Sequence, residues 1–396
     1  MKKKIDKPLV IGIVGTGYGS ELHGNGYINM VGVPVRLKTV CGGSNLAKAE
    51  KIKEKFGYEI ATLDYMDIIN DPEIDVVDIT VNQDLHIPLA IKAMRAGKDV
   101  ICEKPLTGYL GDGSDNIGNT VRKSLMYDAV LAQMDELKRV IKETGRKFMY
   151  AENTVYATPI QKAAEIIRAK KTKIMLMTSE NTLIGSSSDK AGHWKNIGGG
   201  TLMRNGIHGL TGMLWLKRVE AKSRGENITI TNVTADMGVQ TTAINNEKHR
   251  YVNAYPVDVE DMALVSVTFS DNTKCVAMCS DAVLGGSRNI LNIYGSDGTL
   301  FCNLNPCNIL NTYFMDEEGL ENVYISEMLP QKTGWNEVFV SDEVIRGYTG
   351  ELKDFLESVA YDTEPDSNFD LAYMVMKVIY AAYQSAEEGR KIEFRA

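Results

Sequence analysis

The sequence lacks the features that mark membrane-spanning and secreted chains. No stretch of its 396 residues approaches the roughly 18 uninterrupted apolar residues of a membrane span. The N-terminal segment MKKKIDKPLVIGIVG runs directly into a buried-strand pattern and shows no signal peptide. We therefore expect a cytoplasmic protein without a membrane partner.

The chain also has fewer basic than acidic residues. Lys and Arg number 44 against 52 Asp and Glu, which gives a net charge of -8, and the only basic cluster is Lys2–Lys4. A nucleic-acid-binding protein normally presents a basic face. The charge balance therefore argues against a nucleic-acid partner.

Cysteine is too scarce for a disulfide framework in a chain of this length. The six cysteines are Cys41, Cys102, Cys275, Cys279, Cys302 and Cys307. Cys275 and Cys279 share one face of a strand-like segment, but no paired CxxC motif or nearby histidine supports a zinc site. We interpret the cysteines as buried thiols and expect no metal.

What the chain does contain is the rhythm of an α/β protein, with length enough for two domains. Strands are expected at 9–15, 36–42, 76–81, 99–104 and 147–153, with helices such as 45–56 and 87–96 between them. After residue 155 the pattern predicts helices at 158–169 and 200–216, strands at 227–240, 260–270, 273–283, 289–295 and 298–304, and a helical end at 350–388. We predict an N-terminal Rossmann domain with a doubly wound parallel sheet (1–152), followed by an α+β domain (153–396) with a large, mostly antiparallel open sheet.

Three features of this organisation carry further expectations. Residues 107–128 are rich in Gly, Asp, Asn and Ser, which predicts a loop inserted in the first domain. The C-terminal helices 350–388 are expected to pack back on the first domain. Surplus hydrophobic sheet in the second domain favours a homo-oligomer.

The segment VIGIVGTGYGS contains the glycine motif Gly15-x-Gly17-x-x-Ser20, which we call the phosphate-loop motif. It predicts a dinucleotide site, because it follows an apolar strand and precedes a helix. Gly15 would allow the tight turn and Gly17 the approach of backbone to a pyrophosphate, with Thr16, Tyr18 and Gly19 beside it. Ser20 stands where a third glycine is usual, and its small side chain should still let helix and strand pack. The alternative is a glycine turn without a ligand.

The choice between NAD and NADP is less defined. NAD-binding proteins usually carry an acidic residue at the end of the second strand, and here TVCGGSN places Gly42 there. Ser44 and Asn45 can hydrogen-bond either a ribose hydroxyl or a phosphate, and Lys48 is a weak phosphate ligand. The residues leave both cofactors open, and we favour NAD(H) slightly over NADP(H).

DLH (84–86), AGKDVICEKPL (96–106), GGGTLMRNGIHG (198–209) and GSDGTL (295–300) together resemble the Gfo/Idh/MocA family of sugar and polyol oxidoreductases over nearly the whole chain. The resemblance implies a nicotinamide cofactor, a sugar substrate and Lys104 beside both. It implies His208 as acid/base, in keeping with an ordinary histidine pKa near 6.5. Cofactor contacts would come from Asn82, Gln83, His86, Glu103, Lys104 and Trp194, although Trp194 could equally belong to the core.

The resemblance also points to substrate ligands. These are Tyr156, Lys195, Arg204 and Asn205. Arg204 stands where the family commonly has Asp, one helical turn before His208. It would either offer donors to sugar hydroxyls or an acidic group, or point outward to a carboxylate elsewhere. His23 is interpreted as structural and His249 as exposed.

The segment EKPLTGYLGDG, the insertion and Arg204 further resemble one branch of the family. Members of that branch oxidise the C3 hydroxyl of glucosides, and a separate lyase then acts on the 3-oxo product. We therefore expect a sugar or glycoside dehydrogenase. An NAD-dependent glycosidase with an oxidation–elimination–reduction cycle and a non-catalytic dinucleotide sensor remain alternatives, which net formation of NADH would distinguish.

Overall fold

The computed structural model describes residues 7–186, 188–305, 310–321, 323, 331–338 and 344–394. The first of its two compact units comprises the described parts of Met1–Gly108, Asp128–Tyr156 and Gly347–Met376, and the second those of Tyr109–Tyr127, Ala157–Arg346 and Lys377–Ala396. Five cysteines are buried free thiols, and Cys307 lies outside the described residues. In the described part of the chain, no helix is long and apolar enough to cross a membrane.

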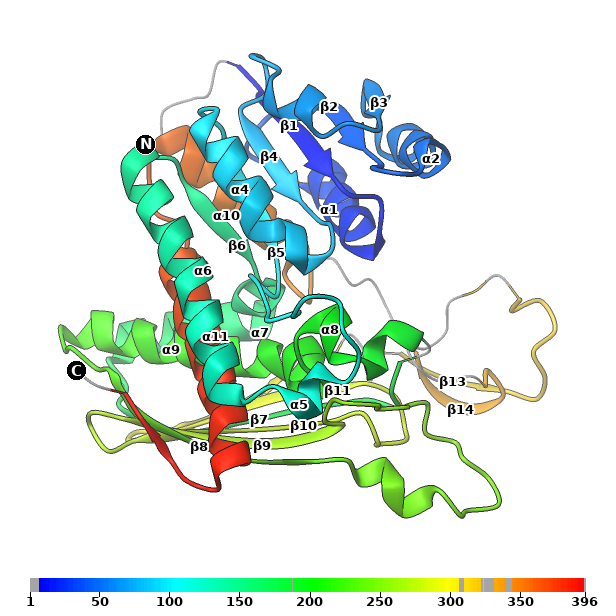
Figure 1. The fold of residues 1–396 in the computed structure, drawn as a ribbon, viewed down its shortest axis with the longest axis vertical. Coiled ribbons are helices and arrows are strands. Elements are labelled where there is room, and N and C mark those ends of the chain that lie inside the picture. Colours follow the sequence, from blue (N-terminus) through cyan, green and yellow to red (C-terminus); the bar gives the residue numbers. More distant parts are fainter. Residues whose placement is uncertain are drawn as a thin grey trace. The chain divides into compact units, whose positions relative to one another are not determined.

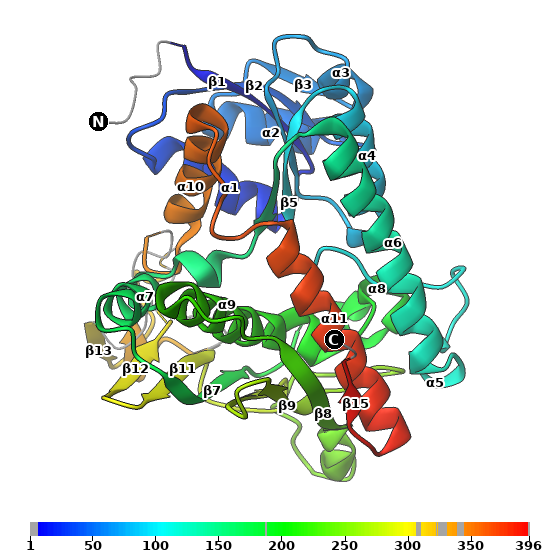
Figure 2. The same ribbon diagram turned by 90° about the vertical axis from the view of Figure 1, so that its left-hand side faces the viewer.

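The first unit is built on a six-stranded parallel sheet with the order β3-β2-β1-β4-β5-β6. Its strands are β1 (Leu9–Val14), β2 (Val35–Cys41), β3 (Ile60–Thr62), β4 (Val76–Ile79), β5 (Asp99–Glu103) and β6 (Phe148–Ala151). Its helices are α1 (Tyr18–Asn29), α2 (Leu46–Phe56), α3 (Met66–Ile69), η1 (Gln83–Leu85), α4 (His86–Arg95), η2 (Asn153–Tyr156), α10 (Tyr348–Tyr361) and most of α6 (Lys123–Thr144). Figure 2 shows α1 and α10 on one face of the sheet and α4 and α6 on the other. Because both faces are covered, β4 and β6 are buried at every residue.

The strand order reverses between β1 and β4, and ligands of open α/β sheets bind at the carboxyl ends of the strands beside such a reversal. The phosphate-loop motif follows β1, and Lys104 follows β5. The predicted Rossmann architecture is confirmed.

The second unit contains a seven-stranded sheet with the order β12-β11-β7-β10-β9-β8-β15, antiparallel except for the β7–β10 pair. Its strands are β7 (Ile174–Thr182), β8 (Ile230–Gly238), β9 (Met262–Phe269), β10 (Lys274–Ser280), β11 (Arg288–Gly295), β12 (Thr299–Asn303) and β15 (Ile392–Glu393), with β13 (Leu310–Phe314) and β14 (Gly334–Val338) forming a separate hairpin. Its helices are α5 (Ile117–Thr120), α7 (Thr158–Lys170), η3 (Asp189–Gly192), α8 (Trp194–Ile197), η4 (Leu202–Gly206), α9 (Ile207–Arg224), η5 (Gln240–Ile244) and the second half of α11 (Phe369–Glu388). This mostly antiparallel sheet also agrees with the prediction.

One face of the larger sheet carries α7 and α9, as Figure 1 shows. Along β9 and β10 the residues that face these helices are buried, whereas Leu264 and Met278 on the opposite face are each 37% exposed. On the same sheet, Phe301 of β12 is 72% exposed. The open face is therefore apolar at several positions.

The structure departs from the predicted organisation in three places. Strand β7 was not predicted, because its second half, TSENT, is polar. Residues Tyr109–Tyr127 of the insertion group with the second unit rather than the first, since Asp258 accepts the backbone N–H of Gly118 at 2.9 Å and the backbone carbonyl of Tyr109 accepts the indole N–H of Trp194 at 3.0 Å. Residues Gly347–Met376 group with the first unit, and α11 is divided between the two.

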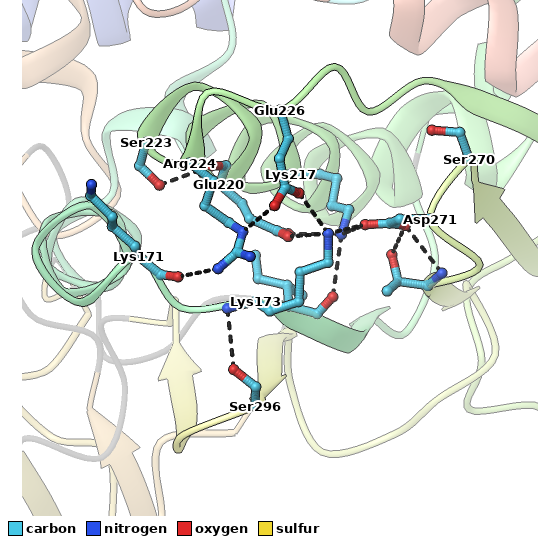
Figure 3. A network of polar contacts seen from close by, with 12 residues as sticks. Lys171, Lys173, Lys217, Glu220, Ser223, Arg224, Glu226, Ser270, Asp271 and Ser296 are labelled. Atoms are coloured by element: carbon cyan, nitrogen blue, oxygen red, sulfur yellow. Dashed lines mark hydrogen bonds and ion pairs between the residues drawn. The ribbon is translucent and has the colours of Figure 1, made fainter.

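A buried polar network anchors the C-terminal half of α9 to the sheet (Figure 3). The Lys217 ammonium, 3% exposed, lies 2.7 Å from Glu220 and 3.0 Å from Asp271 in the β9–β10 turn. Lys173, just before β7, lies 2.7 Å from the same Asp271. Although burial opposes it, hydrogen bonds from Lys173, Thr273 and Lys217 hold the pKa of Asp271 below its usual range. The network fixes the helix whose first turn carries His208.

Candidate active site

The phosphate-loop motif forms an open cradle at the N-terminus of α1. Gly15 has φ 129°, and a Cβ there would lie 2.5 Å from the Thr80 hydroxyl oxygen, so only glycine fits. Gly17 is the N-cap of α1 without a side-chain cap, and a Cβ added to it would meet no atom within 4 Å. The space beside the start of α1 is therefore open, and the uncapped N–H groups of a helix N-terminus are suited to a phosphate group. Thr16, Tyr18 and Gly19 border this space in sequence, and Tyr18 is 70% exposed.

Ser20 occupies the position of the third glycine and is fully buried. Its hydroxyl donates to the Gly17 carbonyl at 3.0 Å and accepts from the Thr80 hydroxyl at 3.3 Å. The expectation that a small residue would still let helix and strand pack is met.

The end of β2 carries no acidic side chain. Gly42 cannot take one on this backbone, because its Cβ would lie 2.4 Å from the Asn45 carbonyl oxygen. Asn45 uses its side-chain oxygen to cap α2, accepting the Lys48 N–H at 3.0 Å, while Ser44 is exposed. Burial raises the pKa of Cys41 at the end of β2, and the charges of Asp64 and Asp67 in the segment after β3 add to the shift.

His86 joins the end of β4 to the segment after β5. Its Nδ1 lies 2.9 Å from the Pro105 carbonyl oxygen and its Nε2 lies 3.0 Å from that of Val81. Burial lowers its pKa, and it is 1% exposed. Each ring nitrogen thus lies beside a backbone carbonyl, which holds the ring in place between β4 and β5. A cofactor contact of His86 stays a prediction. Asn82 is exposed at the same edge, whereas Gln83 is buried.

Glu103 and Lys104 lie at the carboxyl end of β5. The Glu103 carboxylate accepts the backbone N–H of Lys104 at 2.8 Å and lies 3.3 Å from the Nε2 of His23. Burial favours the neutral acid, but the hydrogen bond and charge of His23 hold the pKa of Glu103 below its usual range. The half-buried Lys104 therefore follows a fixed, ionised carboxylate.

In the second unit, the glycine run at 198–200 lets a helix begin against a buried acid. A Cβ on Gly200 would lie 1.9 Å from the Glu260 carbonyl oxygen. The Glu260 carboxylate accepts the N–H groups of Gly200 and Leu202, each at 2.9 Å, and the Tyr383 hydroxyl at 3.0 Å. It thereby caps the π-helical turn η4, an element often found at functional sites.

His208 is half-buried in the first turn of α9, and Arg204 lies in η4 one turn earlier. The Arg204 guanidinium pairs with Asp281, whose other oxygen accepts the Thr201 hydroxyl at 2.9 Å. Burial lowers the pKa of Arg204, and its side chain is 18% exposed. Asn205 donates to the Asn181 carbonyl of β7 at 3.0 Å and is buried. Its substrate role stays a prediction.

Arg204 and Asp281 line a cavity of about 420 Å³ in the second unit. Much of its wall is polar, with contributions from Ser186, Ser188, Asp189, His193, Asn253, Tyr255, Glu260 and Asp261. Such a lining suits a ligand with many hydroxyl groups. Arg204 thus pairs with a carboxylate and borders a cavity, and its contact with a substrate stays a prediction.

Three other predicted ligands have structural partners. Trp194 is 2% exposed, packs 4.7 Å from the Tyr383 ring and lies under the Lys123 ammonium, so its core interpretation is the one that fits. Lys195 pairs with Asp115 of the insertion. The buried Tyr156 hydroxyl donates to Asp354 at 2.7 Å and accepts the Ser367 N–H at 2.9 Å, which leaves no ready donor for a substrate. The predicted ligand roles of Trp194, Lys195 and Tyr156 stay predictions.

Sequence reasoning missed several residues of the site. Asp281 and Glu260 lie 77 and 60 residues from the groups they bind. Asp64 and Asp67, in the segment after β3, lie close enough to the end of β2 to raise the pKa of Cys41. Only the position of His23 after the glycine motif offered a local signal, and it was interpreted as structural. His249 is exposed, as expected.

The fold and the cradle define a two-domain protein with a dinucleotide-binding Rossmann domain. Residues 9–128 match the model of the Gfo/Idh/MocA oxidoreductase family, NAD-binding Rossmann fold, and residues 173–394 match the model of its C-terminal α/β domain. The chain therefore belongs to the Gfo/Idh/MocA oxidoreductase family.

Similar proteins include two dehydrogenases. Levoglucosan dehydrogenase of Pseudarthrobacter phenanthrenivorans is 39% identical over 129 residues, which span 31% of this chain and 30% of that enzyme. Myo-inositol 2-dehydrogenase of Thermotoga maritima is 22% identical over 385 residues, 97% of this chain and 98% of that enzyme. Among solved structures, GenD2 from gentamicin A biosynthesis, in complex with NAD, shares the fold with a TM-score of 0.77 at 20% identity, covering 100% of this chain and 99% of its own.

Proposed function

We propose that this chain is an NAD(H)-dependent dehydrogenase that acts on a ring hydroxyl of a sugar or glycoside. The observation that carries the proposal is the pairing of an open phosphate cradle at α1 with Lys104 at the carboxyl end of β5 in the same unit. NAD bound along this edge would supply the hydride acceptor.

The residues of the chain would handle the proton and the charge. The Lys104 ammonium would donate a hydrogen bond to the reacting oxygen and lower the cost of its alkoxide-like charge. A ring nitrogen of His208 would accept the hydroxyl proton. Gly17 and the first N–H groups of α1 would hold the pyrophosphate.

The test is NADH formation from NAD⁺ and a panel of sugars and glucosides by the purified protein. We expect Lys104→Met and His208→Asn to lower kcat by roughly 100-fold or more while the NAD affinity stays within a few-fold. Full activity in both variants would refute the assigned roles. Sugar release without net NADH would favour the glycosidase alternative.

We propose that the part of the substrate that binds in the Arg204 cavity carries no charge. Supporting this, Asp281 already neutralises Arg204, and Asp189, Glu260 and Asp261 add further carboxylates to the wall. An anionic group there would meet like charge. The expected result is a higher kcat/KM for a glucoside than for the matched glucuronide; the reverse order would overturn the proposal.

We further propose C3 of the glucose ring as the oxidised carbon, with a separate lyase consuming the 3-oxo product, on the basis of the EKPLTGYLGDG resemblance. A 3-oxo group acidifies the neighbouring C–H, which makes elimination of an aglycone possible. NMR of the product identifies the carbonyl carbon, and a carbonyl at any other ring carbon would refute the assignment.

NAD(H) rather than NADP(H) is the cofactor that we propose. No arginine occurs in residues 42–48, and the nearby Asp64 and Asp67 would repel a 2′-phosphate. Titration of the protein with each nucleotide tests this, with tighter binding of NADP⁺ as the contradicting result.

The assembly that we propose is a homo-oligomer formed through the open face of the larger sheet. Leu264 and Met278 on that face are apolar and partly exposed. Light scattering should give a mass above the 43.8 kDa of one chain, and Leu264→Glu with Met278→Glu should reduce it. Met315→Glu, at a residue that is 81% exposed outside the sheet, serves as the control. A monomeric wild-type protein would contradict the proposal.

A further inference from the structure

A histidine is buried among carboxylates behind the phosphate loop. His23 on α1 is fully buried, and its Nδ1 lies 2.8 and 3.0 Å from the two carboxylate oxygens of Asp78 on β4. Its Nε2 lies 3.3 Å from Glu103 on β5 and 3.9 Å from Glu351 on α10. The Tyr27 hydroxyl donates to the same Asp78 at 2.8 Å.

Only one protonation state of His23 suits these neighbours. A neutral imidazole carries one N–H, so one of its nitrogens would turn a lone pair toward a carboxylate. The imidazolium carries an N–H on both nitrogens, so Nδ1 can donate to Asp78 while Nε2 lies at ion-pair distance, 3.3 Å, from Glu103. Burial opposes the charge, but the carboxylates of Asp78 and Glu103 outweigh it and raise the pKa of His23 well above its usual value. Burial raises the pKa of Glu351, which favours its neutral form.

Glu103 lies between His23 and Lys104 of the proposed active site. Glu103 is held by His23 on one side, and its other oxygen accepts the backbone N–H of Lys104 at 2.8 Å. A Cβ built on Gly19 would lie 3.3 Å from Glu103, so the same carboxylate also lies against the phosphate loop. An unpaired carboxylate in this place would tend to take up a proton or move toward water.

We propose that His23, as an imidazolium held by Asp78, is a positioning residue that keeps Glu103 ionised and in place, so that Glu103 fixes Lys104 at the end of β5. The inference rests on the proposed function for its kinetic consequence. Its structural part, a charged histidine bridging Asp78 and Glu103, stands on the geometry of the first unit alone.

The structural part is tested without activity. The chain has five histidines, so the imidazole ¹⁵N resonances of the wild-type protein can be resolved, and those lost in His23→Gln identify His23. At pH 7.5, well above the ordinary histidine value of about 6.5, we expect His23 to keep the imidazolium pattern. A neutral pattern at that pH would overturn the proposal.

The kinetic part uses His23→Gln, Glu103→Gln and the double variant, with the exposed His249→Gln as the matched control. We expect His23→Gln to lower kcat by roughly 10- to 100-fold, because Lys104 is displaced, with little change in the KM for NAD⁺. The double variant should be no worse than Glu103→Gln alone, since His23 acts through Glu103. Additive losses, or an unchanged kcat in His23→Gln, would refute the positioning role. If no sugar is oxidised by the wild type, the proposed function fails, while the ¹⁵N result still decides the charge on His23.

Discussion

Gly17→Ala separates nucleotide binding from folding, because the structure leaves room for the methyl group on the protein side. No atom lies within 4 Å of a Cβ at Gly17, whose φ of -90° any residue can adopt. Alanine is a poorer N-cap than glycine, so the free energy of unfolding should fall by about 1 kcal/mol or less. The methyl group would, however, occupy space that a pyrophosphate needs to reach the N–H groups of α1.

The magnitude follows from the hydrogen bonds at risk. A hydrogen bond to a charged group contributes about 1.5 to 3 kcal/mol, so losing one weakens NAD binding by roughly 10- to 100-fold. Calorimetric titration with NAD⁺ measures the Kd, and urea melts measure stability. Gly298→Ala, in the β11–β12 turn and also without neighbours within 4 Å, is the control that should change neither. An unchanged Kd in Gly17→Ala would show that the phosphate does not bind at α1, and a collapse of stability would refute the steric reasoning.

Three further predictions concern the second unit. In urea melts, Glu220→Gln should lower the free energy of unfolding by about 3 kcal/mol, because it removes the charge of a fully buried partner of the buried Lys217. The control Glu226→Gln changes a carboxylate that is 35% exposed and should lower it by less than about 1 kcal/mol. Asp281→Asn removes the negative charge that pairs with Arg204 and should shift the glucuronide-to-glucoside ratio of kcat/KM upward by about tenfold. An unchanged ratio would argue against the cavity as the substrate site. Because the pKa of Asp271 is lowered in the folded protein, its stabilising effect is complete above its ordinary pKa and is lost as the pH falls below about 4, so acid titrations of stability should be steeper for the wild type than for Asp271→Asn.

Much of the nucleotide half was predictable, because its signals are local in sequence. The apolar run of β1, the glycines after it and the helix that follows lie within about twenty residues, and their order fixes a strand, a turn and a phosphate cradle. Lys104 follows β5 directly, so its place at the carboxyl edge of the sheet also comes from the chain itself.

The substrate half was less predictable, because its contacts join distant segments. Nothing near Arg204 indicates that Asp281 takes its charge, and nothing near Trp194 indicates that Tyr109 accepts its indole N–H. The side-chain chemistry of Trp194 and Tyr156 suits a ligand and a core equally well. Their burial and their partners are defined only by the folded chain.

The most direct test of the proposed activity follows the hydrogen itself. A glucoside carrying deuterium on the ring carbon to be oxidised is incubated with the protein and NAD⁺, and the nicotinamide C4 position is examined by NMR. We expect one deuterium on C4 for each oxidised sugar, and roughly 100-fold slower transfer with Lys104→Met. NAD⁺ that stays unlabelled while the sugar is consumed would contradict direct hydride transfer and with it the proposed dehydrogenase.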